Sequence, residues 1–160
     1  VLLFRIGDFY EMFDDDAVNV SRAIGLTLTQ RTAGIPMAGM PFHQLDTYLR
    51  KLLAAGFRVA VCEQVGDATA KPAGAGKGII ERGVTRVLTP GTLIDESLLT
   101  DEQRSTLACV CFCGSPGPGM PDRVAMALAD LSTGDLRVVW SDGARLGDDL
   151  LAHGASEVLY

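Results

Sequence analysis

The first part of the chain alternates apolar and polar positions in a pattern that predicts two strands and a helix. Residues 2–6 and 9–13 are apolar stretches on either side of a Gly-Asp pair, which is typical of two strands joined or bent at a glycine. Three aspartates at residues 14–16 supply a helix N-cap and a negatively charged first turn, and apolar residues then recur at helical spacing. We therefore predict a first helix that ends at Gly25.

The next part of the chain continues the alternation of strands and helices. Residues 26–30 alternate as a strand does, whereas two glycines and two prolines within residues 34–41 predict a loop or an extended edge. Residues 44–55 place apolar side chains at three-and-four spacing, which predicts a second helix. Further strands are expected at residues 57–62 and 85–89. This order of elements is typical of an α/β domain.

A polar and charged segment at residues 95–105 separates this domain from a second unit, so we predict one domain over residues 1–104 and another over residues 105–160. In the second unit we expect three strands, a helix and a last strand, at residues 107–113, 124–131, 136–140, 145–153 and 158–160. Antiparallel strands followed by a helix and a strand are typical of the opening of an RNase H-like fold. We expect the sheet of this second unit to be unfinished.

The 160-residue chain is 48% hydrophobic and 21% charged, which is ordinary for a folded protein and excludes the disordered class. No apolar run approaches the ~20 residues that cross a bilayer, and Arg5 interrupts the apolar start, unlike in a signal peptide. We therefore expect a cytoplasmic protein. Because the chain begins at Val1 and stops in an apolar stretch at Tyr160, we expect it to be a fragment.

Charge is distributed unevenly along the chain. The net charge is −6, yet residues 50–90 carry seven Lys or Arg against three acids, a local charge of +4. A protein that held DNA only by neutralising phosphates would need a larger positive surface. We therefore expect this chain by itself to bind duplex DNA weakly.

Three of the four cysteines, Cys109, Cys111 and Cys113, alternate along a predicted strand and so share one face of it. Four cysteines do not make a disulfide framework in a chain of this length, which favours a reducing compartment. A metal site would need further ligands nearby, and His43 and His153 are distant in sequence. We predict buried apolar cysteines, with a metal site as the alternative.

The sequence GAGKG at residues 74–78 resembles a phosphate-binding loop but departs from the Walker A pattern. That pattern needs glycine where Lys71 stands and serine or threonine where Gly78 stands. We therefore predict a mobile surface loop, whose lysines are able to touch a phosphate. A nucleotide-hydrolysing domain built on Lys77 is the alternative.

Asp130 and Asp135 form the best carboxylate pair for hydrolytic chemistry, at the end of one strand and the start of the next. Turn and capping roles explain both, and a nuclease of the RNase H type would need more metal-binding acids. No serine or cysteine nucleophile pairs with a histidine and a third orienting group. We predict no catalytic residue and no metal site. A nuclease built on Asp130, and a protein-interaction module in the acidic second unit, are the alternatives.

Phe9, Tyr10 and Glu11 form an aromatic-carboxylate stretch in the second predicted strand. Period-two alternation places Phe9 and Glu11 on one side and Tyr10 on the other. One interpretation is a core aromatic beside a solvated acid. The other is a surface for a nucleic-acid base, because a ring beside a carboxylate makes a poor core. The pattern alone leaves both open.

Four motifs bear on this choice: GDFYEMF at residues 7–13, PMAGMPFH at 36–43, VAVCEQ at 59–64 and LTPGT at 88–92. In order and approximate spacing they resemble the mismatch-recognition domain of the MutS family of DNA mismatch-repair proteins. A weaker similarity at LSTG, residues 131–134, extends into the connector domain of that family. The resemblance implies an α/β fold with a mixed β-sheet and flanking helices, followed by the opening strands of an RNase H-like connector.

The resemblance implies that Phe9 stacks on a mispaired or unpaired base from the minor groove and that Glu11 hydrogen-bonds to that base. Unstacking costs least where pairing is already defective, so such a probe senses deformability more than base identity. On intact duplex Glu11 would find no free base edge and its repulsion from phosphates would stay uncompensated. At a mispair, a hydrogen bond would offset that repulsion.

Further positions match DNA-binding parts of the family. Arg31 matches a basic residue placed against the DNA backbone, with a surface ion pair as the alternative. Pro36 and Met37 match a loop near the minor groove, with packing as the alternative. Gly7 and Asp8 are expected to shape the turn that presents the aromatic stretch.

Some matched positions are expected to have structural roles, and other features of the family belong to the whole protein. His43 and the CEQ segment at residues 62–64 are expected to be structural. The resemblance implies a parent that is an ATP-dependent sensor of replication errors, uses ATP and Mg²⁺ in a separate ATPase domain, forms a homodimer and binds a MutL-type partner. The fragment is expected to need no cofactor. Its expected ligand is double-stranded DNA with mispairs or small loops, in the bacterial cytoplasm at the nucleoid.

Overall fold

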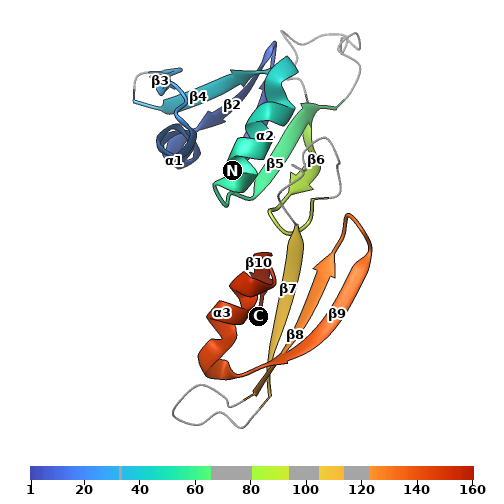
Figure 1. Ribbon diagram of the computed structural model, residues 1–160. Helices are drawn as coiled ribbons and strands as arrows, with labels where there is room; N and C mark the ends of the chain where they lie inside the picture. The colour runs from blue at the N-terminus through green and yellow to red at the C-terminus, as the bar shows by residue number, and fades with distance from the viewer. Residues whose placement is uncertain (33, 66–80, 94–104, 114–122) are drawn as a thin grey trace. The chain divides into compact units, whose positions relative to one another are not determined.

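The computed structural model describes residues 1–32, 34–65, 81–93, 105–113 and 123–160. The chain divides into two compact units, Val1–Leu88 and Thr89–Tyr160 (Figure 1). The domain boundary predicted after residue 104 borders a segment outside the described residues and stays a prediction. No helix in the described ranges is long and apolar enough to cross a membrane.

The first unit is built on a six-stranded mixed β-sheet with the order β3-β4-β2-β1-β5-β6. Its strands are β1 Leu2–Ile6, β2 Phe9–Phe13, β3 Thr29–Gln30, β4 Pro36–Pro41, β5 Val59–Gln64 and β6 Arg82–Leu88. Its helices are α1 Asp14–Ile24, the 3-10 turn η1 Phe42–Gln44 and α2 Leu45–Ala54. β1 runs parallel to β5, and the other neighbours are antiparallel. The predicted α/β fold with a mixed sheet is confirmed.

The predicted turn at Gly7 joins β1 to β2. Ile6 pairs with Phe9, so Gly7 and Asp8 alone form the loop. Gly7 has a φ of 57°, a conformation that glycine adopts without the steric cost of a Cβ. The carbonyl of Asp8 accepts a hydrogen bond from the Phe42 amide at 3.0 Å, which ties the turn to the segment after β4.

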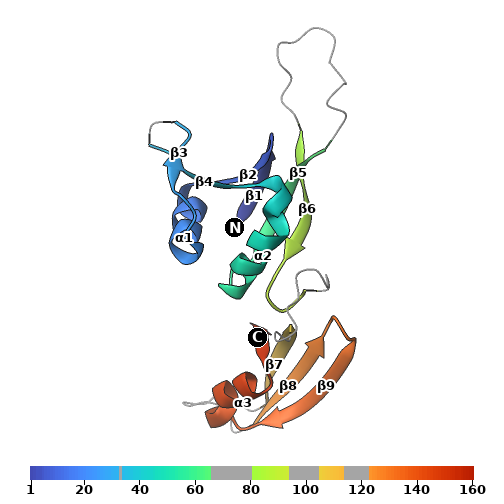
Figure 2. The same cartoon turned by 45° about the horizontal axis from the view of Figure 1, so that its top comes forward.

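Both helices of the first unit cover the same face of its sheet. α1 packs on β4 and β2, α2 packs on β4 and β5, and the two helices contact each other (Figure 1, Figure 2). Six apolar strand residues on this covered face are fully buried, and they are Leu3, Met12, Ala38, Met40, Val59 and Val61. Burying one of the leucine, valine or methionine side chains contributes about 1.5–3 kcal/mol. The opposite face, which includes Phe9 and Glu11, carries no helix among the described residues.

Three expectations for this unit were wrong in detail. Residues 36–41 form a strand between β3 and β2, not a loop, because Pro36 and Pro41 occupy only its ends and leave the interior amides free to donate. The predicted strand at residues 26–30 shortens to Thr29–Gln30. α1 has Phe13 as its N-cap without a side-chain cap bond, and Asp16 instead accepts a hydrogen bond from the Leu2 amide at 2.8 Å.

The second unit holds a four-stranded sheet with the order β10-β7-β8-β9. Its elements are β7 Thr106–Cys113, β8 Arg123–Asp130, β9 Asp135–Ser141, the 3-10 turn η2 Gly143–Arg145, α3 Leu146–Ala152 and β10 Ala155–Leu159. β10 runs parallel to β7, and the other pairs are antiparallel. The predicted succession of three strands, a helix and a strand is confirmed, while its assignment as an RNase H-like connector stays a prediction.

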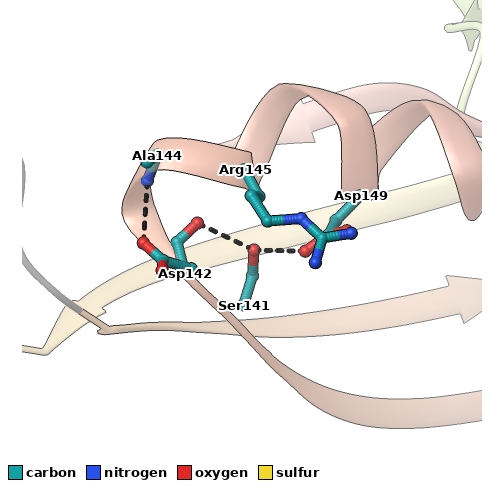
Figure 3. A network of polar contacts seen from close by, with 5 residues as sticks. All are labelled: Ser141, Asp142, Ala144, Arg145 and Asp149. Atoms are coloured by element: carbon teal, nitrogen blue, oxygen red, sulfur yellow. Dashed lines mark hydrogen bonds and ion pairs between the residues drawn. The ribbon is translucent and has the colours of Figure 1, made fainter.

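A polar network fixes the start of α3 against the end of β9 (Figure 3). The buried Ser141 hydroxyl donates to the Asp149 carboxylate at 2.6 Å, and the Asp142 carboxylate accepts from the Ala144 amide at 3.1 Å. Arg145 adds an ion pair to Asp149 at 3.8 Å. The helix is thereby oriented so that its apolar residues pack on a small core of Val110, Val124 and Met126, against which Leu146 and Leu150 lie.

The prediction of buried cysteines on β7 was wrong. Cys109, Cys111 and Cys113 do share one face of the strand, but that face is exposed. The core of this unit lies on the other face, where Ala108 and Val110 are buried. In the described ranges, no group of three His, Cys, Asp or Glu side chains is placed to hold a metal ion.

Candidate nucleic-acid interface

Phe9 lies at the first position of β2, directly after the Gly7-Asp8 turn, and 47% of its surface is exposed. Its neighbour Tyr10 is only 6% exposed on the opposite face. The predicted alternation is therefore confirmed, and the ring of Phe9 is not part of the core. A half-exposed phenylalanine on a strand beside a tight turn is accessible to a flat partner such as a base.

Tyr10 anchors the strand that carries Phe9. Its hydroxyl donates a hydrogen bond to the Glu63 carboxylate on β5, and the guanidinium of Arg5 lies 5.5 Å from its ring centre. Burial, and then the hydrogen bond and negative charge of Glu63, raise the pKa of Tyr10 to about 12. Glu63 thus has the structural role expected of its segment. Because Tyr10 is fixed, the backbone that presents Phe9 is fixed as well.

Glu11 follows on the same face as Phe9 and forms an ion pair with Arg31. The Glu11 carboxylate lies 2.8 Å from the Arg31 guanidinium, and the two side chains are 17% and 51% exposed. The surface ion pair that the sequence offered as the alternative for Arg31 is present in the structure. Contact of Arg31 with a DNA backbone remains a prediction.

Gly39 shapes the space beside Glu11, and sequence reasoning did not single it out. It pairs with Glu11 across the sheet, and a Cβ at this position would lie 3.3 Å from the Tyr10 carbonyl oxygen and 3.5 Å from the Glu11 Cγ. Glycine therefore leaves room for the stem of the Glu11 side chain. A glycine inside a strand is itself a signal of close approach, but the pairing that explains it comes from the sheet.

Met37 and Pro36 lie in β4, next to this face. Met37 pairs with Phe13, and the sheet places both side chains on the face of Phe9 and Glu11, whereas Pro36 pairs with Gln30 at the edge. Both are half-buried. Both residues lie in a paired strand, and their approach to a minor groove stays a prediction.

Phe42 is a second exposed aromatic near the turn that sequence reasoning missed. It is 44% exposed, and the Arg5 guanidinium lies 3.9 Å from its ring centre, a favourable cation–π arrangement. Its amide holds the Asp8 carbonyl, and it follows Pro41, the partner of Phe9 in the sheet. The available signal was an aromatic directly after a strand-ending proline. His43 lies in the 3-10 turn before α2, in agreement with the structural role expected of it.

Comparison with known proteins assigns these features to a family. The family model described as "MutS domain I" matches residues 1–97. The chain belongs to this family. It is 43% identical over 99% of its length to the DNA mismatch repair protein MutS of Azorhizobium caulinodans, and 43% identical to that of a Synechococcus species over the same share. The MutS of Fervidobacterium nodosum is 42% identical, again over 99% of the chain.

The chain spans 17% of the Azorhizobium relative and 18% of the other two. The MutS relatives are thus similar across nearly all of this chain, including the second unit, while the domain I model itself ends at residue 97. Within the structure, Thr89 and the residues that follow it group with the second unit. Residues 89–93 of the domain I match therefore belong to the second unit and not to the six-stranded sheet.

The alternative enzymatic sites receive no support from the described residues. The loop at residues 74–78 lies outside them. Asp130 has the predicted turn role: its carboxylate accepts hydrogen bonds from the Ser132 hydroxyl at 2.6 Å and from the Ser132 and Thr133 amides. Asp135 lies opposite Asp130 at the start of β9 and pairs with Arg137 at 3.1 Å. Both aspartates are explained by the β8–β9 turn.

Proposed function

We propose that this chain is a mismatch-recognition module that senses mispaired or unpaired bases in duplex DNA. Phe9 is the wedge that stacks on the defective base, and Glu11 hydrogen-bonds to it. The observation that carries the proposal is the exposed ring of Phe9 on a strand whose opposite face is anchored, with the Glu11 carboxylate two residues along on the same face. The names of the MutS relatives support the same class of ligand.

The energetics of an aromatic wedge favour defective sites. Stacking an aromatic side chain on a base contributes about 1–3 kcal/mol, while separating two base steps costs a few kcal/mol. On intact duplex the cost of separating the bases equals or exceeds the stacking energy, so inserting the ring does not favour binding. At a mispair or an unpaired base the cost falls, and a saving of about 1.4 kcal/mol already gives a tenfold preference. Phe9 therefore selects for weak pairing without reading a sequence.

A fixed position of the wedge is needed for this selection. Gly7 and Asp8 form the turn that presents Phe9, and the Phe42 amide holds that turn through the Asp8 carbonyl. A ring that could swing away from the groove would lose its stacking contact without opening the duplex. In this proposal Met37 and Pro36 lie along the minor groove beside the wedge, and Arg31 contacts the DNA backbone.

The whole protein is proposed to be an ATP-dependent sensor of replication errors. It would use ATP and Mg²⁺ outside this chain, act as a homodimer in which one subunit inserts its phenylalanine, and bind a MutL-type partner. Its place would be the bacterial cytoplasm, at the nucleoid. The support is the similarity to bacterial MutS proteins that are several times longer than this chain.

The test compares Phe9→Ala with a matched variant in the full-length protein that carries this sequence. Phe112→Ala is the control, because Phe112 has the same exposed fraction, 47%, but lies in the second unit. Affinity is measured for a duplex with one unpaired thymine and for a perfect duplex. We expect Phe9→Ala to remove most of the preference for the unpaired base and Phe112→Ala to keep it. A preference that survives in Phe9→Ala would overturn the proposal.

A further inference from the structure

The Glu11–Arg31 ion pair raises a question for the proposed contacts of both residues. The Arg31 guanidinium lies 2.8 Å from the Glu11 carboxylate. A phosphate that shared this guanidinium would lie close to the negative charge of Glu11 and be repelled by it. The phosphate contact of Arg31 and its ion pair with Glu11 therefore compete.

The surroundings of the pair determine which partner moves. Glu11 lies in the interior of the sheet, with β1 on one side at Phe4 and β4 on the other at Gly39, and its side chain is mostly covered. Arg31 directly follows the two-residue edge strand β3, and half of its side chain is exposed. The long Arg31 side chain can turn toward solvent, whereas the Glu11 backbone is held by its neighbours. Because half of the Arg31 side chain is exposed, solvent screens the pair in part, and opening it costs less than opening a fully buried pair.

We propose that Arg31 exchanges partners during recognition, from the Glu11 carboxylate in the free protein to a DNA phosphate at a mispair. This inference rests on the proposed function of Phe9 and Glu11. When Glu11 turns to the defective base, a hydrogen bond to that base replaces its bond to Arg31. The released guanidinium then binds a backbone phosphate, for which its planar fork of donors is well suited.

On intact duplex the exchange does not take place. Glu11 finds no free base edge there, so releasing Arg31 would leave the carboxylate unpaired beside the phosphates. Arg31 therefore stays with Glu11, and one phosphate contact is not made. Arg31 thus adds a phosphate contact at a mispair and makes none on paired DNA. This difference makes Arg31 a specificity-determining residue, and its pairing with Glu11 is the cause.

The exchange is testable through the salt dependence of binding, because each phosphate neutralised by a cation contributes about 0.9 to the slope of log K against log salt. In the full-length protein, slopes are measured for Arg31→Gln on a duplex with one unpaired thymine and on a perfect duplex. We expect the slope to fall by about 0.9 on the unpaired-thymine duplex and to stay unchanged on the perfect duplex. Between 50 and 200 mM salt that difference corresponds to roughly a threefold change in affinity.

A second background isolates the role of Glu11. In Glu11→Gln the neutral amide no longer retains the guanidinium by charge, so Arg31 is free to bind phosphate on either duplex. Adding Arg31→Gln to this background should lower the slope by about the same amount on both duplexes. Arg50→Gln, which removes an exposed arginine from α2 on the covered side of the sheet, is the control, and it should change the two slopes equally.

Two results would overturn the exchange while leaving the proposed function intact. Either Arg31→Gln changes both slopes equally with Glu11 present, or it changes neither, while Phe9→Ala still abolishes the preference for the unpaired base. If Phe9→Ala leaves that preference unchanged, the proposed function itself fails. Thermal unfolding of each variant shows whether it is still folded. Because Phe9 and Arg31 are both about half exposed, we expect Phe9→Ala and Arg31→Gln to remain folded.

Discussion

Replacing Tyr10 by phenylalanine tests whether the Tyr10–Glu63 hydrogen bond, on the buried face of β2, stabilises the strand that presents Phe9. The substitution keeps the buried ring but removes the hydroxyl that donates to Glu63. A hydrogen bond to a charged group contributes about 1.5–3 kcal/mol. Burial is the largest cause of the raised pKa of Tyr10 and the Glu63 hydrogen bond is the next, so the shift supports the direction of this prediction but does not measure the hydrogen bond. We expect the free energy of unfolding of the first unit to fall by about 2 kcal/mol at pH 8.

The difference in free energy of unfolding between Tyr10→Phe and the parent should depend on pH. The pKa of Tyr10 is higher in the folded state than in the unfolded state, so its stabilising contribution is complete below pH 10 and is lost as pH rises through about 12. Tyr10→Phe has no such contribution to lose. The difference in stability between the two proteins should therefore be largest below pH 10 and shrink toward zero near pH 12.

Urea unfolding at several pH values between 8 and about 11.5 measures this difference. Circular dichroism follows both units, and the fluorescence of the single tryptophan, Trp140, reports the second unit alone as an internal reference. Tyr48→Phe is the matched control, because Tyr48 lies on α2 with Lys51 at 5.2 Å from its ring centre, and its hydroxyl makes no hydrogen bond among the described residues. If Tyr10→Phe and the parent lose stability in parallel across this pH range, the Glu63 hydrogen bond does not hold β2.

Two further predictions concern the parts that support the site. Gly7→Ala should lower the free energy of unfolding of the first unit by about 1–2 kcal/mol, because an L-residue is strained at a φ of 57°. Gly7→Asn should lower it less, because asparagine tolerates this conformation better. Equal losses for the two variants in urea unfolding would argue against backbone strain. Leu49→Ala, which empties a fully buried site beneath the sheet, should cost about 2–5 kcal/mol, whereas Leu151→Ala at an exposed site should stay within about 0.5 kcal/mol. Comparable losses for the two leucines, again by urea unfolding, would contradict the described core.

Local pattern was sufficient wherever neighbouring residues decide the structure. β1 and β2 have the predicted bounds, because their apolar stretches are short and separated by Gly7, and the opposite orientation of Phe9 and Tyr10 follows from strand geometry alone. α1 ends at Ile24 before Gly25, whose left-handed φ of 74° suits glycine. The motifs around Phe9 were likewise sufficient to indicate the family that the comparisons confirm.

Local pattern was insufficient wherever the answer depends on what lies across the sheet. The prolines of residues 34–41 argued against a regular element, yet β3 and β2 flank this segment and make it an interior strand. The alternation of Cys109, Cys111 and Cys113 indicated a shared face but carried no information on which face the second unit covers. That choice is made by α3 packing on the other side, near Val110.

The chemistry around Phe9 divides in the same way. The sequence by itself determined that an aromatic ring and a carboxylate share one face of a strand, because the two-residue period of an extended chain requires it. Only the tertiary structure brought Arg31 to Glu11 from 20 residues away and Gly39 to the opposite strand. Such contacts arise from strand pairing between distant segments, and the register of that pairing is set by burial of the whole sheet face, not by the residues that meet.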